Sequence, residues 1–158
     1  MKVSLYAATL LVSLVAQAAT PSQGHSTWPD GAAVVLLPPR GKEVLRFCSR
    51  TAPKSVSGFW EVPVADVVGI DVALAKHLRD ARIDKKLTLP VPKYQRQYLG
   101  VLRGTERFIY INAFAARFRS AVVNSRKEMP RICDGGTVTW GIEYDVTKRV
   151  FLGFAPNY

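Results

Sequence analysis

The chain has few of the side chains that most often bind metals or act as nucleophiles. Its 158 residues include two cysteines, two histidines and two methionines, and His25 and His77 lie far apart, as do Cys48 and Cys133. A protein metal site needs three or four ligands at close spacing. A serine or cysteine nucleophile needs a histidine or another base beside it. We therefore expect no metal and no cofactor, and nucleophilic catalysis is the weakest enzymatic option.

Motifs of nucleotide and hydrolase sites are absent as well. The sequence contains no G-x-x-x-x-G-K-S/T loop, no G-x-G-x-x-G and no G-x-S-x-G, which are the patterns that cradle phosphates or expose a nucleophilic serine. It also has no internal repeat and no low-complexity segment. These features indicate one small domain without a nucleotide cofactor.

Long hydrophobic runs are missing except at the N-terminus. Lys2 precedes an apolar stretch from Val3 to Val15, and residues 16–19 (Ala-Gln-Ala-Ala) supply the small side chains that signal peptidase needs. The run is shorter than the roughly 20 residues that cross a bilayer. The pattern predicts a signal peptide over residues 1–19, cleaved after Ala18 or Ala19. The mature protein is then secreted or periplasmic, and not transmembrane.

Acidic residues are scarce. The chain has 22 Lys and Arg against 12 Asp and Glu, a formal net charge of +10, and loss of the signal peptide removes one positive charge. Such a balance favours anionic partners: an anionic polymer, a membrane surface or an acidic protein. We expect an exported, non-enzymatic binding or accessory protein for an anionic envelope or extracellular partner. An inhibitor or immunity-type protein with one specific protein partner is an alternative.

The two cysteines are expected to pair. Export places Cys48 and Cys133 in an oxidising compartment, where a disulfide is the usual state. The bridge would close a loop covering most of the mature chain, and the chain-entropy model gives it roughly 4–5 kcal/mol. The sequence therefore predicts a single disulfide.

Proline and glycine divide the mature chain into a leader and a domain. Residues 20–43 are rich in both, which is typical of irregular structure, although Ala32 to Leu37 could form a short edge strand. Residues 44–158 then make one α+β domain. It begins with a strand at Val44 to Cys48, which alternates polar and apolar residues, and continues in a loop over 51–61.

The spacing of apolar residues predicts a helix over residues 63–82. Pro63 suits the first helical position, and positive charge at the far end suits the helix dipole. Six apolar residues recur at helical spacing: Val64, Val67, Val68, Leu74, Ala75 and Leu78.

A β-hairpin is expected next, with its turn at Gly104-Thr105 between strands 94–103 and 106–114. Its register would place opposite each other Arg103 and Glu106, Val101 and Phe108, Leu99 and Tyr110, and Tyr98 and Ile111. Both faces of this hairpin carry large apolar groups. One face should pack on the helix, and the other needs a cover: the leader, a second sheet layer or a partner.

The C-terminal part predicts two more strands. Residues 137–144 alternate between polar and apolar side chains, and Val150 to Ala155 follow a turn. Gly100, Gly141 and Gly153 lie within strands, where glycine marks a bulge, sharp curvature or a close backbone approach. The expected fold is α+β: one main helix packed on a curved antiparallel sheet of four to six strands.

Arginines mixed with aromatic residues give a candidate binding surface. Tyr94 and Arg96 resemble a stacking surface for bases or sugars, although alternation on a two-sided sheet produces the same pattern by core packing. The most basic stretch, which includes a short helix near Phe114 to Val122, adds further positive charge. The candidate binding residues are Tyr94, Arg96, Arg117, Arg119, Arg126, Lys127 and Arg131.

Carboxylate chemistry is the enzymatic alternative. Asp134, Glu143 and Asp145 cluster in the sequence near Trp140, and paired carboxylates in unequal environments serve as acid and base in glycoside cleavage. A small envelope hydrolase using Asp134 and Glu143 is thus possible. Turn chemistry is the competing interpretation, because aspartates before glycines and at hairpin corners stabilise turns. A deep polar cleft around Asp134, Glu143 and Trp140 would favour the enzyme.

Overall fold

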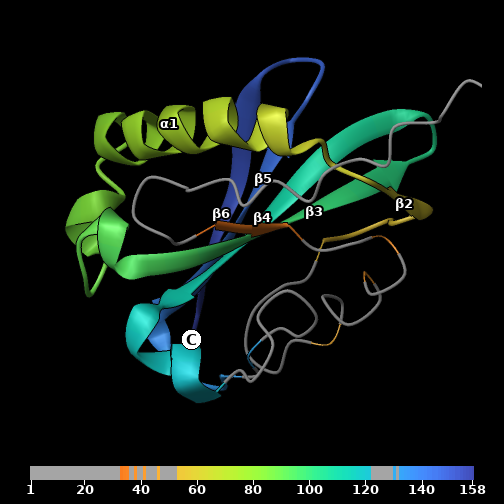
Figure 1. Ribbon diagram of the computed structural model, residues 1–158. Helices are drawn as coiled ribbons and strands as arrows, with labels where there is room; N and C mark the ends of the chain where they lie inside the picture. Colours follow the sequence, from red (N-terminus) through yellow and green to blue (C-terminus); the bar gives the residue numbers. More distant parts are fainter. Residues whose placement is uncertain are drawn as a thin grey trace, which may run out of the picture.

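One long helix lies on one face of a twisted sheet in the computed structural model of the protein (Figure 1). The structure describes residues 33–35, 38, 41, 46, 53–121, 130 and 132–158. The predicted signal peptide, most of the predicted strand at 44–48 and most of the basic stretch therefore lie outside the described residues. None of the described helices is long and apolar enough to cross a membrane.

The sheet has six strands, in the order β1-β3-β4-β5-β6, with β2 also pairing with β3. Strands β2 to β6 pair antiparallel, whereas β1 runs parallel to β3. The α+β prediction is therefore confirmed, although the sheet is not wholly antiparallel. The strands are β1 Ala33–Val35, β2 Gly58–Trp60, β3 Tyr94–Arg103, β4 Glu106–Ala115, β5 Gly136–Asp145 and β6 Val150–Asn157.

The predicted hairpin is confirmed as β3 and β4, in the predicted register. All four expected pairs face each other, from Arg103 with Glu106 to Tyr98 with Ile111. Gly104 has a φ of 59°, the positive value that two-residue hairpin turns need at their first position.

The edge of the sheet beside β3 was only partly predicted. A short strand at Ala33–Val35 agrees with the expected edge strand within 32–37, but β2 lies in the segment expected to be a loop. Tertiary contacts hold β2 in place: the Trp60 indole N–H donates to the Phe108 carbonyl at 3.1 Å. The indole lies against Gly100, where a Cβ would collide with it and with the Trp60 carbonyl. Only glycine permits this approach.

The predicted helix is confirmed as α1, Val64–Asp80, with Pro63 at the N-cap. Four of its side chains face the sheet and are buried: Val67, Ile70, Leu74 and Leu78. They pack in one core with β-sheet residues that include Tyr98, Ile111 and Trp140. Two residues of the predicted apolar pattern, Val64 and Val68, are instead 48% and 44% exposed. The stripe that contacts the sheet is therefore narrower than the apolar stripe in the sequence.

The sheet face opposite α1 carries a second, smaller apolar cluster. Leu99, Val101, Phe108 and Tyr110 form it, because residues at alternate positions of a strand point to opposite faces. Val56 and Phe59, from the segment before α1, pack against this cluster. The prediction that both sheet faces are apolar and that one packs on the helix is confirmed, and residues near β2 cover part of the other face.

A β-bulge in β6 sets the direction of its side chains. Gly153 has a φ of 65°, and the pairing of β5 with β6 shifts between Gly141 and Glu143. One extra residue in the strand lets Phe151 and Phe154 both pack in the core on the α1 side. The predicted irregularity at Gly153 is confirmed, and it shapes the pocket described below.

Three 3-10 helices lie within residues 53–121 of the described chain. They are η3, Asp84–Lys86, η4, Val91–Lys93, and η5, Ala116–Ala121. The first two lie between α1 and β3, and the third replaces the expected short helix after β4. Figure 1 shows η5 on the side of the sheet opposite α1.

Candidate functional site

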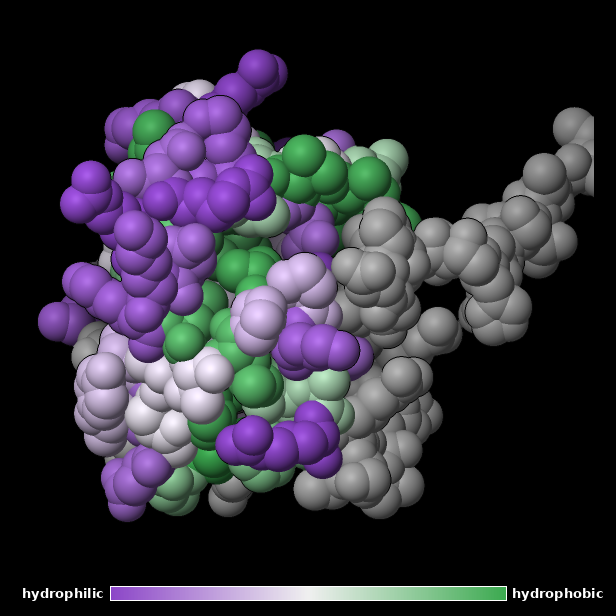
Figure 2. Space-filling view, turned by 90° about the vertical axis from the view of Figure 1, so that its left-hand side faces the viewer, coloured by the Kyte–Doolittle hydropathy of each residue, from purple (hydrophilic) through white to green (hydrophobic). Residues whose placement is uncertain are grey.

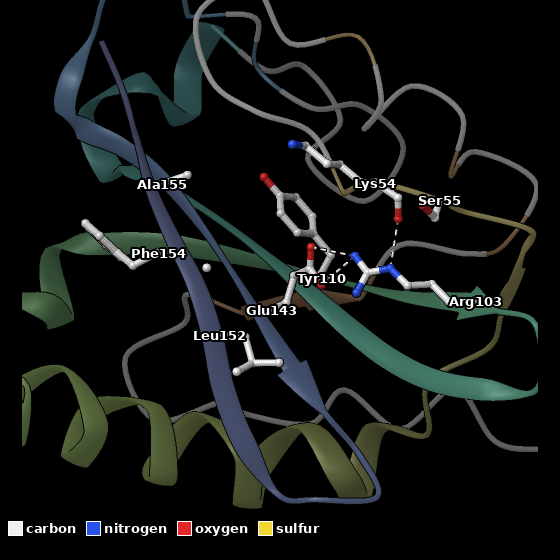
Figure 3. Close-up of a pocket in the computed structure, with 9 residues that line it drawn as sticks. Lys54, Ser55, Arg103, Tyr110, Glu143, Leu152, Phe154 and Ala155 are labelled. Atoms are coloured by element: carbon white, nitrogen blue, oxygen red, sulfur yellow. Dashed lines mark hydrogen bonds and ion pairs between the residues drawn. The ribbon is translucent and has the colours of Figure 1, made fainter.

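A pocket of about 570 Å³ opens on the sheet face opposite α1 (Figure 3). Its polar lining comes from the segment before β2 and from three neighbouring strands, and its apolar wall is residues 152–155 of β6. The polar lining residues are Lys54, Ser55, Arg103, Tyr110 and Glu143.

Strand register brings the pocket residues together. Tyr110 of β4 and Glu143 of β5 are direct cross-strand partners, so their side chains share a face. Arg103 ends β3 and points to the same face as the alternate residues Val101 and Leu99. The bulge at Gly153 then places Leu152 and Ala155 along the same pocket.

Arg103 and Glu143 form a partly buried ion pair at the centre of the pocket. The Arg103 Nη2 atom lies 2.8 Å from Glu143 Oε1 and 2.7 Å from Oε2, and Arg103 Nε donates to the Lys54 carbonyl at 2.8 Å. The guanidinium also lies 4.5 Å from the centre of the Phe108 ring, a cation–π distance. These contacts fix the orientation of Arg103, and Arg103 compensates the charge of Glu143.

Lys54 and Tyr110 form the other polar part of the pocket. Figure 3 shows the Lys54 side chain extending in the same direction as the hydroxyl end of Tyr110, away from the Arg103 guanidinium. The Tyr110 hydroxyl lies over Gly141, where a Cβ would collide with it, so the predicted close approach at Gly141 is confirmed. The lining residues thus carry two cations and one carboxylate.

Tyr94 and Arg96, two of the predicted binding residues, lie inside the protein. Their exposed fractions are 0% and 4%, and the Tyr94 hydroxyl donates to the Thr137 carbonyl at 2.6 Å. A stacking surface needs exposed side chains, so these two residues do not provide one. The alternation that suggested a surface comes from core packing on a two-sided sheet.

Arg96 instead joins α1 to β3 through Asp71. Its Nε and Nη2 atoms lie 2.6 and 2.9 Å from the two carboxylate oxygens of Asp71, and the Tyr98 hydroxyl donates to the same carboxylate. Burial, together with the charge of Asp71, raises the pKa of Tyr98 well above its ordinary value. The Nη2 contact is a charge-assisted hydrogen bond, a strong type of polar contact, and Nε adds an ion-pair contact without a hydrogen bond. Together they fix the helix on the sheet.

Most of the predicted basic surface lies outside the described residues. Arg117 is exposed in η5, with its Cζ atom 5.0 Å from the centre of the Phe118 ring. The side chain of Arg119 and the residues Arg126, Lys127 and Arg131 are not described. Figures 1 and 3 place η5, the element that carries Arg117, on the same side of the sheet as the pocket.

The predicted carboxylate cluster is not brought together at the pocket. Of the three acidic residues, only Glu143 is among the described residues that line it, and Trp140 is fully buried on the α1 side. Asp134 is exposed in a turn with a φ of 51°. Neither Asp134 nor Trp140 is among the described residues that line the pocket with Glu143.

Asp145 has a local role at the hairpin corner. Its Oδ1 atom accepts the backbone N–H groups of Thr147 at 3.0 Å and Lys148 at 2.9 Å. Its Oδ2 atom lies 3.0 Å from Lys148 Nζ. The backbone hydrogen bond from Lys148 lowers the pKa of Asp145, and the Lys148 ammonium lowers it further. The turn interpretation is confirmed for this residue.

Sequence reasoning missed the pocket. Arg103 and Tyr110 were placed correctly in the hairpin, but Lys54 lies in a segment without a recognisable pattern. The pairing of β4 with β5, which brings Arg103 to Glu143, joins strands that are far apart in the sequence, and no local pattern indicated it. No group of three or more potential metal ligands occurs among the described residues.

The fold and the pocket define a small α+β protein with an open, cation-bearing pocket on the sheet face opposite its helix. Comparison with protein-family models, curated proteins and solved structures finds no match.

Proposed function

We propose that this is an exported, non-enzymatic protein that binds an anionic polymer on the sheet face opposite α1. The observation that carries the proposal is the charge arrangement of the pocket. The one carboxylate among its described lining residues, Glu143, is already paired with Arg103, so the charge of Lys54 is left for a ligand. Lys54 has no ion pair with a described residue.

The size and walls of the pocket support a ligand of moderate size. A volume of about 570 Å³ lies within the usual range of roughly 300–1,000 Å³ for ligand sites. The apolar wall of β6 can contact the uncharged part of a repeating unit, and the exposed Lys54 ammonium can contact its anionic group. The hydrogen bonds of Arg103 to Glu143 and to the Lys54 carbonyl hold this side of the pocket in a fixed conformation.

Basic residues outside the pocket, on the sheet face opposite α1, can add to the contact with a polymer. Arg117 lies in η5 on this side of the sheet, and the stretch predicted to bind continues with Arg119, Arg126, Lys127 and Arg131. A polymer has many anionic groups and can contact both regions at once. The overall charge of +10 adds long-range attraction to such a partner.

Binding assays with three anionic probes test the proposal. Heparin, poly-glutamate and phosphatidylglycerol vesicles would each be offered to the mature protein over a range of salt concentrations. The affinity for one of the polymers should fall steeply with salt, because binding releases counterions. Lys54→Gln should weaken that binding and flatten the salt slope. Lys85→Gln, which removes the same charge from the exposed 3-10 helix η3, should leave both almost unchanged.

The outcomes separate the alternatives. Equal loss in Lys54→Gln and Lys85→Gln would mean that only net charge matters, and the pocket proposal would be wrong. Binding to vesicles but to neither polymer would indicate a membrane surface. No binding to any probe would remove the anionic partner and favour the inhibitor or immunity-type alternative.

The hydrolase alternative keeps one favourable observation, the position of Glu143 in the pocket. Inverting and retaining glycosidases both use two carboxyl groups, and no second one lies among the described lining residues. We therefore expect no polysaccharide degradation by the purified wild type, and none by Glu143→Gln. Activity that is present in the wild type and lost in Glu143→Gln would replace the binding proposal with the enzyme.

Export and the disulfide are part of the same proposal. Cys133 is described and is not a free thiol, whereas Cys48 lies outside the described residues. The secreted protein should begin at Ala19 or Thr20 and take up no alkylating reagent before reduction. Cys48→Ser should lower the free energy of unfolding by roughly 2–5 kcal/mol. Two alkylated cysteines in the folded, unreduced protein would contradict the bridge.

A further inference from the structure

The outer face of α1 is apolar over its first ten residues, and nothing among the described residues covers it. Three valines stand out because they are 48%, 44% and 69% exposed: Val64, Val68 and Val72. Three small residues, Ala65, Gly69 and Ala73, lie beside them and are exposed as well. We call these six residues the α1 stripe. Figure 2 shows hydrophobic surface at the level of α1, next to a strongly hydrophilic region.

Gly69 is not explained by the fold of one chain. A Cβ at this position would meet nothing within 4 Å, and glycine inside a helix costs about 0.5–1 kcal/mol relative to alanine. A glycine at this position would be favoured if a second molecule packed closely against the helix here. Small side chains let two helices come nearer than the usual 8–10 Å between their axes.

We propose that the α1 stripe is the interface of a two-fold symmetric homodimer in which two α1 helices pack antiparallel. Self-pairing suits this surface, since a two-fold interface uses the same patch on both partners. With the axis at the level of Val68 and Gly69, Ala65 of each copy faces Val72 of the other. Each valine then lies against a small residue, and the helix dipoles oppose each other.

Charge complementarity argues for the antiparallel arrangement. The start of the helix is acidic and its last turns are basic, with exposed Glu61 before it and exposed Lys76 and Arg79 near its end. Glu61 lies in the extended segment before the helix, so in this arrangement it comes near the last turns of the other copy, where Lys76 is exposed. Among the described residues of one chain, Lys76 pairs only with Asp80, both largely exposed, and such a surface pair contributes little. Lys76 can therefore take a partner in the other copy.

The dimer should be weak. Stable complexes bury roughly 800 Å² on each partner, and one helix pair supplies less. We expect the weight-average mass in sedimentation equilibrium to rise with concentration in the micromolar range, from that of a monomer toward twice that value.

Matched variants test the interface. Val72→Glu should weaken association by about tenfold or more, whereas Val150→Glu, at a similarly exposed valine in β6, should not change it. Gly69→Ala should raise the melting temperature by roughly 2–5 °C and yet weaken the dimer. This opposite effect on folding and association is not expected of a merely exposed glycine.

A charge swap tests the antiparallel register. Lys76→Glu and Glu61→Lys should each weaken the dimer, and the double variant should restore it. A wild type that stays monomeric at every concentration would overturn the proposal. So would a dimer that Val72→Glu leaves intact, or a double variant as weak as the two single ones.

Discussion

The two faces of the sheet each carry an arginine of β3 paired with a carboxylate, and the two pairs differ in their surroundings. Arg96 faces α1, where its side chain is 5% exposed, whereas Arg103 faces the pocket, where its side chain is 23% exposed. The two arginines are seven positions apart, an odd number, so they point to opposite faces, since side chains alternate along a strand. An arginine–carboxylate pair thus attaches the helix to one face of the sheet, and a second such pair lines the pocket on the other face.

This comparison teaches that an arginine–carboxylate pair is not a site by itself. The Arg96 pair is surrounded by the larger core and by the hydroxyl of Tyr98, so no ligand can reach it. The Arg103 pair lies beside a cavity with a further cation, Lys54. Changes at the first pair should affect stability, and changes at the second should affect binding.

The largest effect is expected from Arg96→Met. Removing one partner of a buried pair leaves the other charge uncompensated, which costs about 3–5 kcal/mol. Urea denaturation should show this loss in the free energy of unfolding. A loss no larger than that of Arg103→Met would mean that the two faces do not differ as described.

The next largest difference is expected between alanine variants of Gly100, which lies against Trp60, and Gly141, which lies under Tyr110. In Gly100→Ala, the new Cβ meets the backbone carbonyl of Trp60 as well as its ring, and overpacking of this kind costs about 1–3 kcal/mol. In Gly141→Ala, it meets the end of the Tyr110 side chain, which can move. Thermal denaturation should rank Gly100→Ala as the less stable variant. The opposite order would contradict the close approach of β2 to β3.

Arg103→Met should have a small effect on stability and a large one on binding. A partly exposed pair contributes about 0–1 kcal/mol, but its loss frees Glu143 and places an uncompensated negative charge in the pocket. Anionic-polymer binding should therefore weaken, while the urea midpoint shifts little. Unchanged binding would show that the pocket does not face the ligand.

The smallest effect is expected at acidic pH, in the stability of a variant at Asp145. The pKa of Asp145 is lowered in the folded protein, so its stabilisation is present above about pH 4 and is lost as the pH falls through the folded value. Asp145→Asn should flatten the acid end of the curve of stability against pH. The variant and the wild type would lose stability in parallel below about pH 4 if the turn contacts did not matter.

Local patterns predicted the parts of the fold that depend on local sequence. The register of β3 with β4 follows from the Gly104 turn and from alternation, and α1 follows from its apolar spacing. Val64 and Val68 belong to the same apolar pattern but are exposed, because spacing alone does not say how wide a stripe the sheet covers.

Contacts between distant segments could not be predicted in the same way. Strand β2 depends on the space above Gly100, which only tertiary structure reveals. The pocket combines Lys54 with residues of four strands, and no sequence spacing joins them. Tyr94 and Arg96 looked like a surface because β3 is buried on both faces, and burial of polar residues there depends on partners such as Asp71.

The most direct test is an NMR titration of the ¹⁵N-labelled mature protein with a short heparin oligosaccharide. The amide signals of Ser55, Gly153, Ala155 and Arg117 should shift together, whereas those of Val68 and Val72 on α1 should stay in place. Shifts concentrated on α1, or shifts spread evenly over both faces, would contradict the claim that the sheet face opposite the helix binds the anionic partner.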